Sequence, residues 1–358
     1  IIEGYLPSCS LSRIVEPFFL GAGKDLPAGK RFGEWAQGVK RRKGEDGSYV
    51  AEDIDFLGNI DDLDDVKDGE VRMGVVSGRT SDNERLCRRL LEKGYKYILL
   101  EKPGATTPKE LRELLSFAKE QNATIIMGYI KNISNYISLG REFEKQCRSD
   151  HPSDSLSLTL LHSNDYTEQG LPECFERNAE GALKNMAIHE LALLSTFWGV
   201  KVGKGAAKAV KSVSCDVDYC DFRNLNGFED FVKGGLVIEI GNNTTIRLLF
   251  DRCGGAFSEF QVAVKCPEGK ETKKEGAWRC PGPEEKSFFE EKQRENPEIM
   301  SYFLLQHSGY VFLKRELAEL ALGEKKKMDE RVAGLEIGVN ALDLAEEFQS
   351  ILLEACKA

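Results

Sequence analysis

The stretch VRMGVVSGRTSDNERLCRRLLEKGYKYILLEKPGATTPKELRELLSFAKEQNATIIM, residues 71–127, decides the predicted fold. Short apolar runs at 71–76, 97–100 and 125–127 are typical of buried strands. The two segments between them begin at capping boxes, Ser81-x-x-Glu84 and Thr107-x-x-Glu110, and continue with apolar residues at helical spacing. This alternation of strand and helix predicts a parallel, doubly wound sheet.

The segment before this stretch allows two interpretations. Residues 14–20 resemble a strand and residues 30–37 a short helix, and a charged loop follows at 40–48. If 14–20 is the second strand of the sheet, the phosphate-binding loop lies upstream of Ile1. If it is the first strand, Gly21-Ala22-Gly23 is the phosphate turn, but Leu26 replaces a third glycine and Pro27 interrupts the following helix. We favour the first interpretation.

The pattern changes after Tyr129. Polar, irregular sequence at 132–165 contains one alternating stretch at 156–161, and a helix begins near Leu183. Strand-like runs follow at 210–214, 236–240, 244–250 and 260–264, with a hairpin turn at 241–243, and the chain ends in helical segments at 297–322 and 331–352. We therefore expect a Rossmann-type domain at 1–130 and an α/β domain with a large, predominantly antiparallel open sheet at 131–358.

Net charge, the length of apolar runs and the spacing of cysteines indicate which partners and which cellular compartment to expect. The 358 residues have a net charge of -10, which argues against nucleic acid, and contain no apolar run of the ~20 residues that a membrane span requires. The ten cysteines form no C-x-x-C pair, so we expect reduced thiols, no metal site, and a reducing compartment such as the cytoplasm or an organelle interior. We expect solvated or structural roles for His151, His162 and His307.

Two short motifs carry the expected chemistry. Glu101-Lys102-Pro103 closes an apolar strand and places the Lys102 amine where open α/β sheets bind ligands. Asn185-Met186-Ala187-Ile188-His189 opens a helix, with Asn185 one turn before His189. A neutral imidazole within reach of an alcohol can accept the hydroxyl proton as hydride leaves for a cofactor.

These motifs resemble those of the Gfo/Idh/MocA oxidoreductases, in which an "EKP" lysine and a "D-x-x-x-H" pair serve a nicotinamide cofactor and a sugar-like alcohol. The resemblance is strongest over residues 71–136, which include Gly128-Tyr129, and over residues 181–199. It implies catalytic roles for Lys102, His189 and Asn185. It also implies NAD or NADP as cofactor, bound by Ser77, Gly78, Arg79, Glu101, Lys102 and Tyr129, although Ser77 to Arg79 also suit a plain turn and Tyr129 an ordinary core position.

The sequence also departs from the family pattern. Asn185 and Ala192 stand where the family has aspartates, and no complete glycine-rich phosphate loop is present. We expect an oxidoreductase that transfers hydride between NAD(P) and a sugar or polyol-like alcohol. The alternative is a non-catalytic binding or assembly subunit that retains the fold. In either case the resemblance implies a homo-oligomer, or a protein partner bound through the sheet of the second domain.

Overall fold

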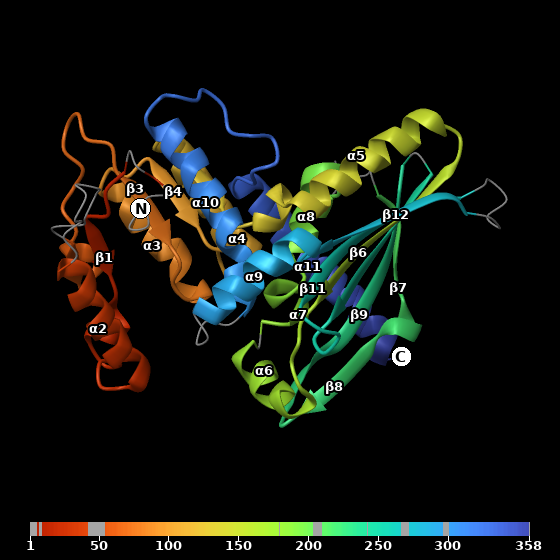
Figure 1. The fold of residues 1–358 in the computed structure, drawn as a ribbon, viewed down its shortest axis with the longest axis horizontal. Coiled ribbons are helices and arrows are strands. Elements are labelled where there is room, and N and C mark those ends of the chain that lie inside the picture. Colours follow the sequence, from red (N-terminus) through yellow and green to blue (C-terminus); the bar gives the residue numbers. More distant parts are fainter. Residues whose placement is uncertain are drawn as a thin grey trace. The chain divides into compact units, whose positions relative to one another are not determined.

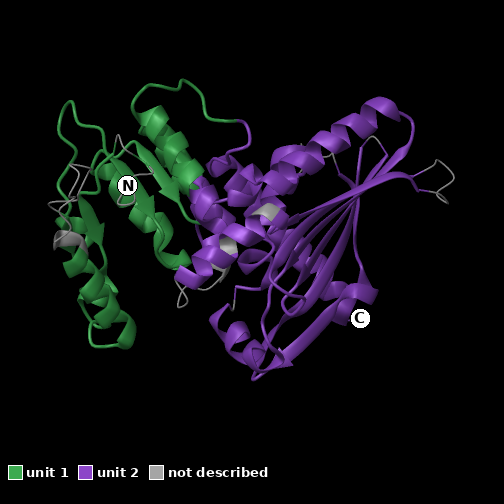
Figure 2. Ribbon diagram, viewed as in Figure 1, with its two compact units in different colours: residues 1–101, 113–126, 311–329 green, residues 102–112, 127–310, 330–358 purple. Residues whose placement is uncertain are grey.

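The computed structural model describes residues 6, 9–41, 54–178, 180–202, 210–241, 243–265, 272–295 and 301–357. The chain forms two compact units, shown in different colours in Figure 2. Unit 1 comprises residues 1–101, 113–126 and 311–329, and unit 2 comprises residues 102–112, 127–310 and 330–358. The division into domains 1–130 and 131–358 stays a prediction.

The parallel sheet with alternating strands and helices that was predicted for residues 71–127 is confirmed. Strands β3 (Met73–Val76), β4 (Tyr97–Leu100) and β5 (Thr124–Met127) form a three-stranded sheet in the order β3-β4-β5 (Figure 1). They alternate along the chain with helices α3 (Thr80–Glu92) and α4 (Pro108–Glu120). Ile98, Leu99 and Leu100 are at most 1% exposed, as expected for a strand that is covered on both faces.

A second, two-stranded parallel sheet in unit 1 pairs β1 (Arg13–Val15) with β2 (Asp55–Leu57). The strand predicted at 14–20 is wrong beyond Val15, because Pro17 begins helix α1 (Pro17–Leu20) and the Glu16 carboxylate accepts hydrogen bonds from the amides of Phe18 and Phe19. Helix α2 (Pro27–Arg41) connects the two strands. Within the described residues, no strand joins this sheet to β3.

The two predicted capping boxes differ in outcome. The second is confirmed: the Glu110 carboxylate accepts from the Thr107 amide at 3.1 Å, and the Thr107 hydroxyl accepts from the Glu110 amide at 3.2 Å. The first is wrong, because α3 already begins at Thr80 and its N-cap, Arg79, makes no side-chain capping bond. Ser81 therefore lies inside the first turn.

Unit 2 is built on a seven-stranded sheet in which most neighbours are antiparallel, as predicted. Its order is β12-β11-β6-β10-β9-β7, with β8 also paired to β9, and β6 and β10 are parallel. The strands are β6 (Ser155–Ser163), β7 (Val210–Cys215), β8 (Asp221–Leu225), β9 (Phe228–Ile240), β10 (Thr244–Asp251), β11 (Phe257–Lys265) and β12 (Thr272–Cys280). The antiparallel pairing of β9 with β10 agrees with the predicted hairpin, whose middle residue, Asn242, lies outside the described residues.

Helix α5 (Asn135–Asp150) lies in the segment that we expected to be irregular. Its buried positions include Gly140 and Glu144, which do not follow an apolar pattern. A Cβ at Gly140 would approach the Phe260 ring to 2.2 Å, so the glycine allows the helix to lie close against β11. Glu144 is 1% exposed and accepts from Arg148 at 2.9 Å and from the Trp198 indole at 3.2 Å. Polar pairing therefore replaces apolar burial on this helix face.

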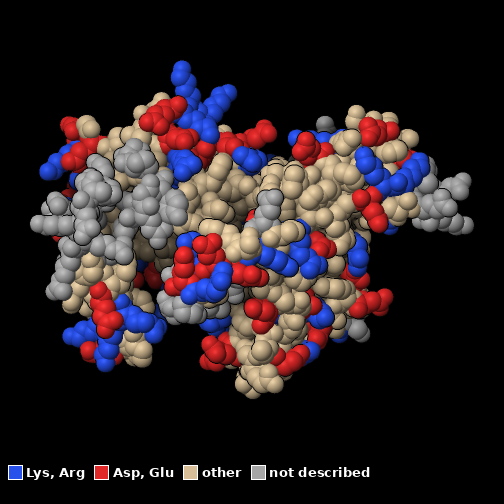
Figure 3. Space-filling view, in the orientation of Figure 1, with Lys and Arg blue, Asp and Glu red and all other residues tan. Residues whose placement is uncertain are grey.

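The remaining helices include the two that were predicted at the end of the chain. They are α6 (Leu171–Arg177), α7 (Ala182–Asn185), α8 (Ile188–Trp198), α9 (Pro283–Glu295), α10 (Ser301–Ala321) and α11 (Leu335–Lys357). Short 3-10 turns are η1 (Ile60–Asp62), η2 (Ile130–Ile133), η3 (Glu168–Gly170) and η4 (Val217–Tyr219). None of the described helices has both the length and the apolar character needed to cross a membrane. On the face drawn in Figure 3, acidic and basic side chains are interspersed.

Candidate functional site

Four of the predicted cofactor residues lie at the carboxyl edge of the β3-β4-β5 sheet in unit 1. Ser77, Gly78 and Arg79 directly follow β3 and are exposed, and Glu101 directly follows β4. The Glu101 amide donates to the Val76 carbonyl at 2.8 Å, so the two strand ends lie side by side. Open α/β sheets bind their ligands at this edge.

The order of the strands in the two sheets of unit 1 indicates whether β1 is the first or the second strand of the doubly wound fold. In the doubly wound order 3-2-1-4-5-6, the second and third strands are neighbours, and the first strand lies between the second and the fourth. The parallel pair β1-β2, joined by α2, fits the second and third strands, and β3, β4 and β5 fit the fourth to sixth. If β1 were the first strand, it would pair with β3. The topology therefore supports the interpretation in which residues 14–20 begin with the second strand.

The glycines at 21–29 pack within their own turn. A Cβ at Gly23 would lie 2.4 Å from the Phe18 ring, and one at Gly29 would lie 2.1 Å from the Gly23 carbonyl oxygen. These glycines therefore allow α1 and α2 to pack closely, and helix α1 separates them from β1. Among the described residues, Ser77 to Arg79 leave the sheet edge exposed, whereas no glycine-rich cradle for a diphosphate is present.

Lys102 and Asn185 are in contact within unit 2. The Lys102 ammonium donates to the main-chain carbonyl of Asn185 at 3.3 Å, and the Lys184 ammonium donates to the Thr106 carbonyl at 3.0 Å. The loop after Lys102 is therefore held against α7 at two points. The Asn185 side-chain amide donates to the Asn178 side-chain oxygen at 2.8 Å.

His189 lies at the beginning of α8 and is 1% exposed. The predicted single helix is interrupted, since α7 ends at Asn185 and α8 begins at Ile188, so the two residues do not share one continuous helix face. Residues 188–195 are all buried, so His189 does not occupy a face distinct from the buried one. Its Nδ1 atom is buried and has no hydrogen-bond partner among the described residues.

The surroundings of His189 favour the neutral imidazole. Burial lowers the pKa of His189 well below 6.5, and the nearby Lys102 and Lys131 ammonium groups lower it further. The Tyr129 ring lies edge-on at 5.9 Å between centroids and is 1% exposed. Of the eight predicted site residues, Lys102, Tyr129, Asn185 and His189 thus belong to unit 2, and the other four belong to unit 1.

A buried charged cluster that the sequence analysis missed lies next to His189. Lys131, just after Tyr129, contacts Glu190 at 2.5 Å and the His162 ring at 2.8 Å, and His162 lies 3.3 Å from Glu190. Burial would raise the pKa of Glu190, but the Lys131 ammonium and the His162 ring hold it well below 4.5, so the carboxylate stays ionised. Of the solvated and structural roles expected for His162, the structural one applies, since the residue is 3% exposed.

The two buried histidines predict a dependence of stability on pH. Burial lowers the pKa of both His162 and His189 below 6.5, so both stay neutral in the folded protein while the unfolded chain binds protons below about pH 6.5. Stability is therefore lost as the pH falls below 6.5, by up to about 1.4 kcal/mol per pH unit for each histidine. Urea unfolding at several pH values should show this loss. A His151→Ala variant should retain it, and a stability that is constant down to pH 5 would contradict the prediction.

A second buried ion pair fixes the start of α7. Arg252 is 0% exposed, and its guanidinium donates to Asp230 at 2.6 Å, to the Phe231 carbonyl at 3.0 Å and to the Cys174 sulfur at 2.9 Å. The other Asp230 oxygen accepts from the Ala182 amide at 3.0 Å. Asp230 therefore caps the helix that ends at Asn185 and helps to position this residue against Lys102.

Comparison with known proteins identifies a family match for part of the chain. Residues 33–129 match the family model GFO_IDH_MocA, described as an oxidoreductase family with an NAD-binding Rossmann fold. This match confirms the predicted resemblance to the Gfo/Idh/MocA oxidoreductases over residues 33–129. No curated protein matches the sequence.

Several solved dehydrogenase structures share the fold. The scyllo-inositol dehydrogenase of Lactobacillus casei, solved with NAD(H) and scyllo-inositol, is 12% identical, with a TM-score of 0.61 over 96% of this chain and 89% of that one. A probable dehydrogenase from Thermotoga maritima is 13% identical, with a TM-score of 0.63 over 99% and 95%. The WlbA dehydrogenase of Bordetella pertussis, solved with NADH and UDP-GlcNAcA, is 12% identical, with a TM-score of 0.58 over 97% and 88%. At these identities, the likeness establishes the fold of the chain.

Proposed function

We propose that the protein is an oxidoreductase that transfers hydride between NAD and a sugar or polyol-like alcohol. The observation that carries the proposal is the buried, neutral His189, whose Nδ1 lacks a partner among the described residues, in a unit that also places Lys102 against Asn185. The description of the family model supports NAD as the cofactor. The inositol and nucleotide-sugar compounds named in the similar structures support a polyhydroxylated substrate.

The chemistry assigned to the residues follows from their charges. The neutral His189 ring accepts the proton of the substrate hydroxyl, because its lowered pKa keeps the base form present at neutral pH. The Lys102 ammonium stabilises the negative charge that develops on the same oxygen. NAD would supply the hydride acceptor. Ser77, Gly78, Arg79 and Glu101 would hold it at the sheet edge of unit 1. Within unit 2, Tyr129 lies next to His189.

The cluster of Lys131, His162 and Glu190 is assigned a positioning role. Glu190 follows His189 directly in the buried start of α8, and its ion pair with Lys131 fixes the orientation of this turn. Lys131 also keeps the His189 pKa low. The cluster thus supports both the position and the protonation state of the proposed base.

A non-catalytic binding or assembly role is the second candidate. It is favoured by Asn185 and Ala192 at the aspartate positions and by the absence of a glycine-rich phosphate cradle among the described residues. An asparagine at 185 can form hydrogen bonds but carries no charge to complement the nearby Lys102 ammonium. Oligomerisation, or a protein partner on the open sheet of unit 2, stays a prediction under both candidates.

Asn185→Asp distinguishes the two candidates. A carboxylate at 185 adds a charge-assisted interaction worth about 1 kcal/mol more than the neutral amide, so we expect kcat/KM to rise about fivefold. The assay follows NAD or NADP reduction by the natural full-length protein with a panel of inositols and nucleotide sugars. Activity in the unmodified protein that rises in the variant supports the enzyme. Activity found only in the variant indicates a site that has lost its function, and activity in neither contradicts the proposed hydride transfer.

A further inference from the structure

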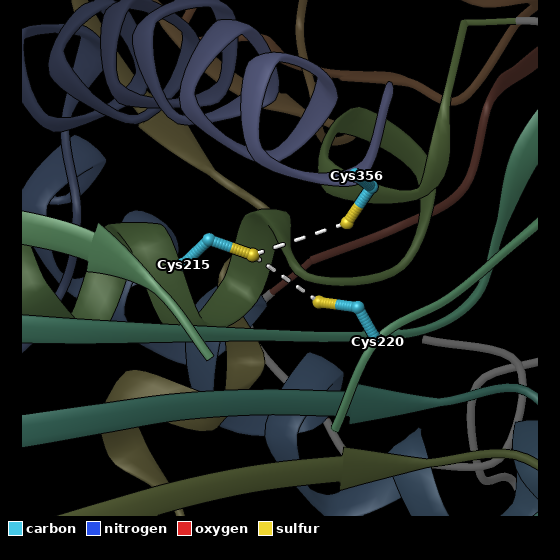
Figure 4. Close-up of side chains that lie close together, drawn as sticks. All are labelled: Cys215, Cys220 and Cys356. Carbon is cyan, nitrogen blue, oxygen red and sulfur yellow. Dashed lines mark hydrogen bonds between the residues drawn. The ribbon is translucent and has the colours of Figure 1, made fainter. Parts of the chain in front are cut away.

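Three cysteines from distant parts of the sequence converge in unit 2. Cys215 ends β7, Cys220 directly follows η4, and Cys356 lies in the last turn of α11 (Figure 4). The Cys215 sulfur lies 3.5 Å from that of Cys220 and 4.0 Å from that of Cys356, and all three lie within 4.8 Å of one another. Each of the three residues is partly exposed.

The sulfur separations match those of thiolates that share a metal ion. A disulfide joins its sulfurs at about 2.05 Å, which is far shorter than the separations found here. Three thiolates bound to one tetrahedral zinc ion at about 2.3 Å lie about 3.8 Å from one another. The separations of Cys215 from Cys220 and from Cys356, 3.5 and 4.0 Å, lie on either side of this value.

A backbone amide supports one of the three sulfurs. The Gly235 amide lies 3.4 Å from the Cys220 sulfur as a hydrogen-bond donor, which is a typical supporting contact for a ligating thiolate.

We propose that Cys215, Cys220 and Cys356 form a zinc site with three thiolate ligands. Binding converts three S–H groups into three Zn–S bonds and releases three protons to solvent, and a water molecule completes the tetrahedral coordination. The ion would tie the end of α11 to β7 and to the segment before β8. This site is independent of the proposed hydride transfer, and no pattern of spacing in the sequence indicates it.

Cobalt(II) tests the proposal directly. The reduced full-length protein is titrated with Co²⁺ without oxygen, and thiolate-to-cobalt charge-transfer absorption is recorded. We expect the absorption to saturate at one equivalent, to disappear when Zn²⁺ is added, and to be lost in Cys215→Ser and Cys356→Ser. Cys253→Ser, which removes a partly exposed thiol outside the cluster, should behave like the unmodified protein.

Three results would overturn the zinc site. They are no charge-transfer absorption in the fully reduced protein, the same absorption in Cys215→Ser as in the unmodified protein, and loss of the absorption in Cys253→Ser. Circular dichroism shows whether each variant is folded. If Cys215→Ser does not fold, Cys356→Ser decides, because its position in the last helical turn makes it the milder change.

Discussion

Replacing His189 by alanine is expected to lower kcat by about 10²- to 10⁴-fold, the contribution typical of a positioned general base. The reason is that the buried, neutral imidazole is the group assigned to accept the hydroxyl proton. The measurement is the rate of NAD reduction with the substrate identified from the inositol and nucleotide-sugar panel. Because removal of the base leaves cofactor binding in place, the Kd for NADH should change little.

His151 provides the matched control for this substitution. It is partly exposed and pairs with Asp154 at 3.4 Å, away from the residues assigned to the site. His151→Ala should therefore retain the unmodified kcat. Equal rates for His189→Ala and the unmodified protein would show that His189 does not accept the hydroxyl proton, even if the protein oxidises an alcohol.

Asp230→Asn is expected to destabilise unit 2 by about 3–5 kcal/mol, because it leaves the Arg252 guanidinium buried without its counter-charge. Arg252 is 0% exposed, and Asp230 is its charged partner at 2.6 Å. Asparagine is close to aspartate in size, but it has one acceptor oxygen and cannot accept from both the Ala182 amide and the Arg252 guanidinium. Urea unfolding followed by circular dichroism therefore measures the combined loss of the charge and of one acceptor.

Asp221→Asn is the corresponding control at a partly exposed ion pair. Asp221 contacts Arg223 at 2.6 Å, and both side chains are about one-third exposed, at 32% and 34%. Solvent screens such pairs, so the expected loss is below about 1 kcal/mol. Similar losses for the two substitutions would contradict the account of Arg252 as a buried charge that depends on Asp230.

Local patterns in the sequence were sufficient to predict the Rossmann-type part and most of the second sheet. The strand-helix alternation of 71–127 depends on neighbouring residues, and so does the second capping box at Thr107. Helix α5 was missed because its buried face contains Gly140 and Glu144. Their burial depends on the Phe260 ring and on arginine partners, which periodicity does not reveal.

The sequence predicted those residues of the candidate site that stand in a short motif. Lys102 and His189 stand in such motifs, whereas Lys131, His162 and Glu190 each resemble a solvated polar residue in the sequence. Their contact arises because β6, η2 and α8 meet in unit 2, and this meeting depends on long-range pairing. The three-cysteine cluster escaped prediction for the same reason, since its members are separated by up to 141 positions.

Titration of the natural full-length protein with NADH and NADPH, followed by nicotinamide fluorescence, tests the central claim most directly. A dehydrogenase site predicts saturable binding of at least one of the two cofactors, weakened in Lys102→Ala because this substitution removes the charge assigned to the site. The fluorescence of the bound form should reach a plateau at one equivalent per chain. Absence of binding by both cofactors would contradict the assignment of the protein as a nicotinamide-dependent oxidoreductase.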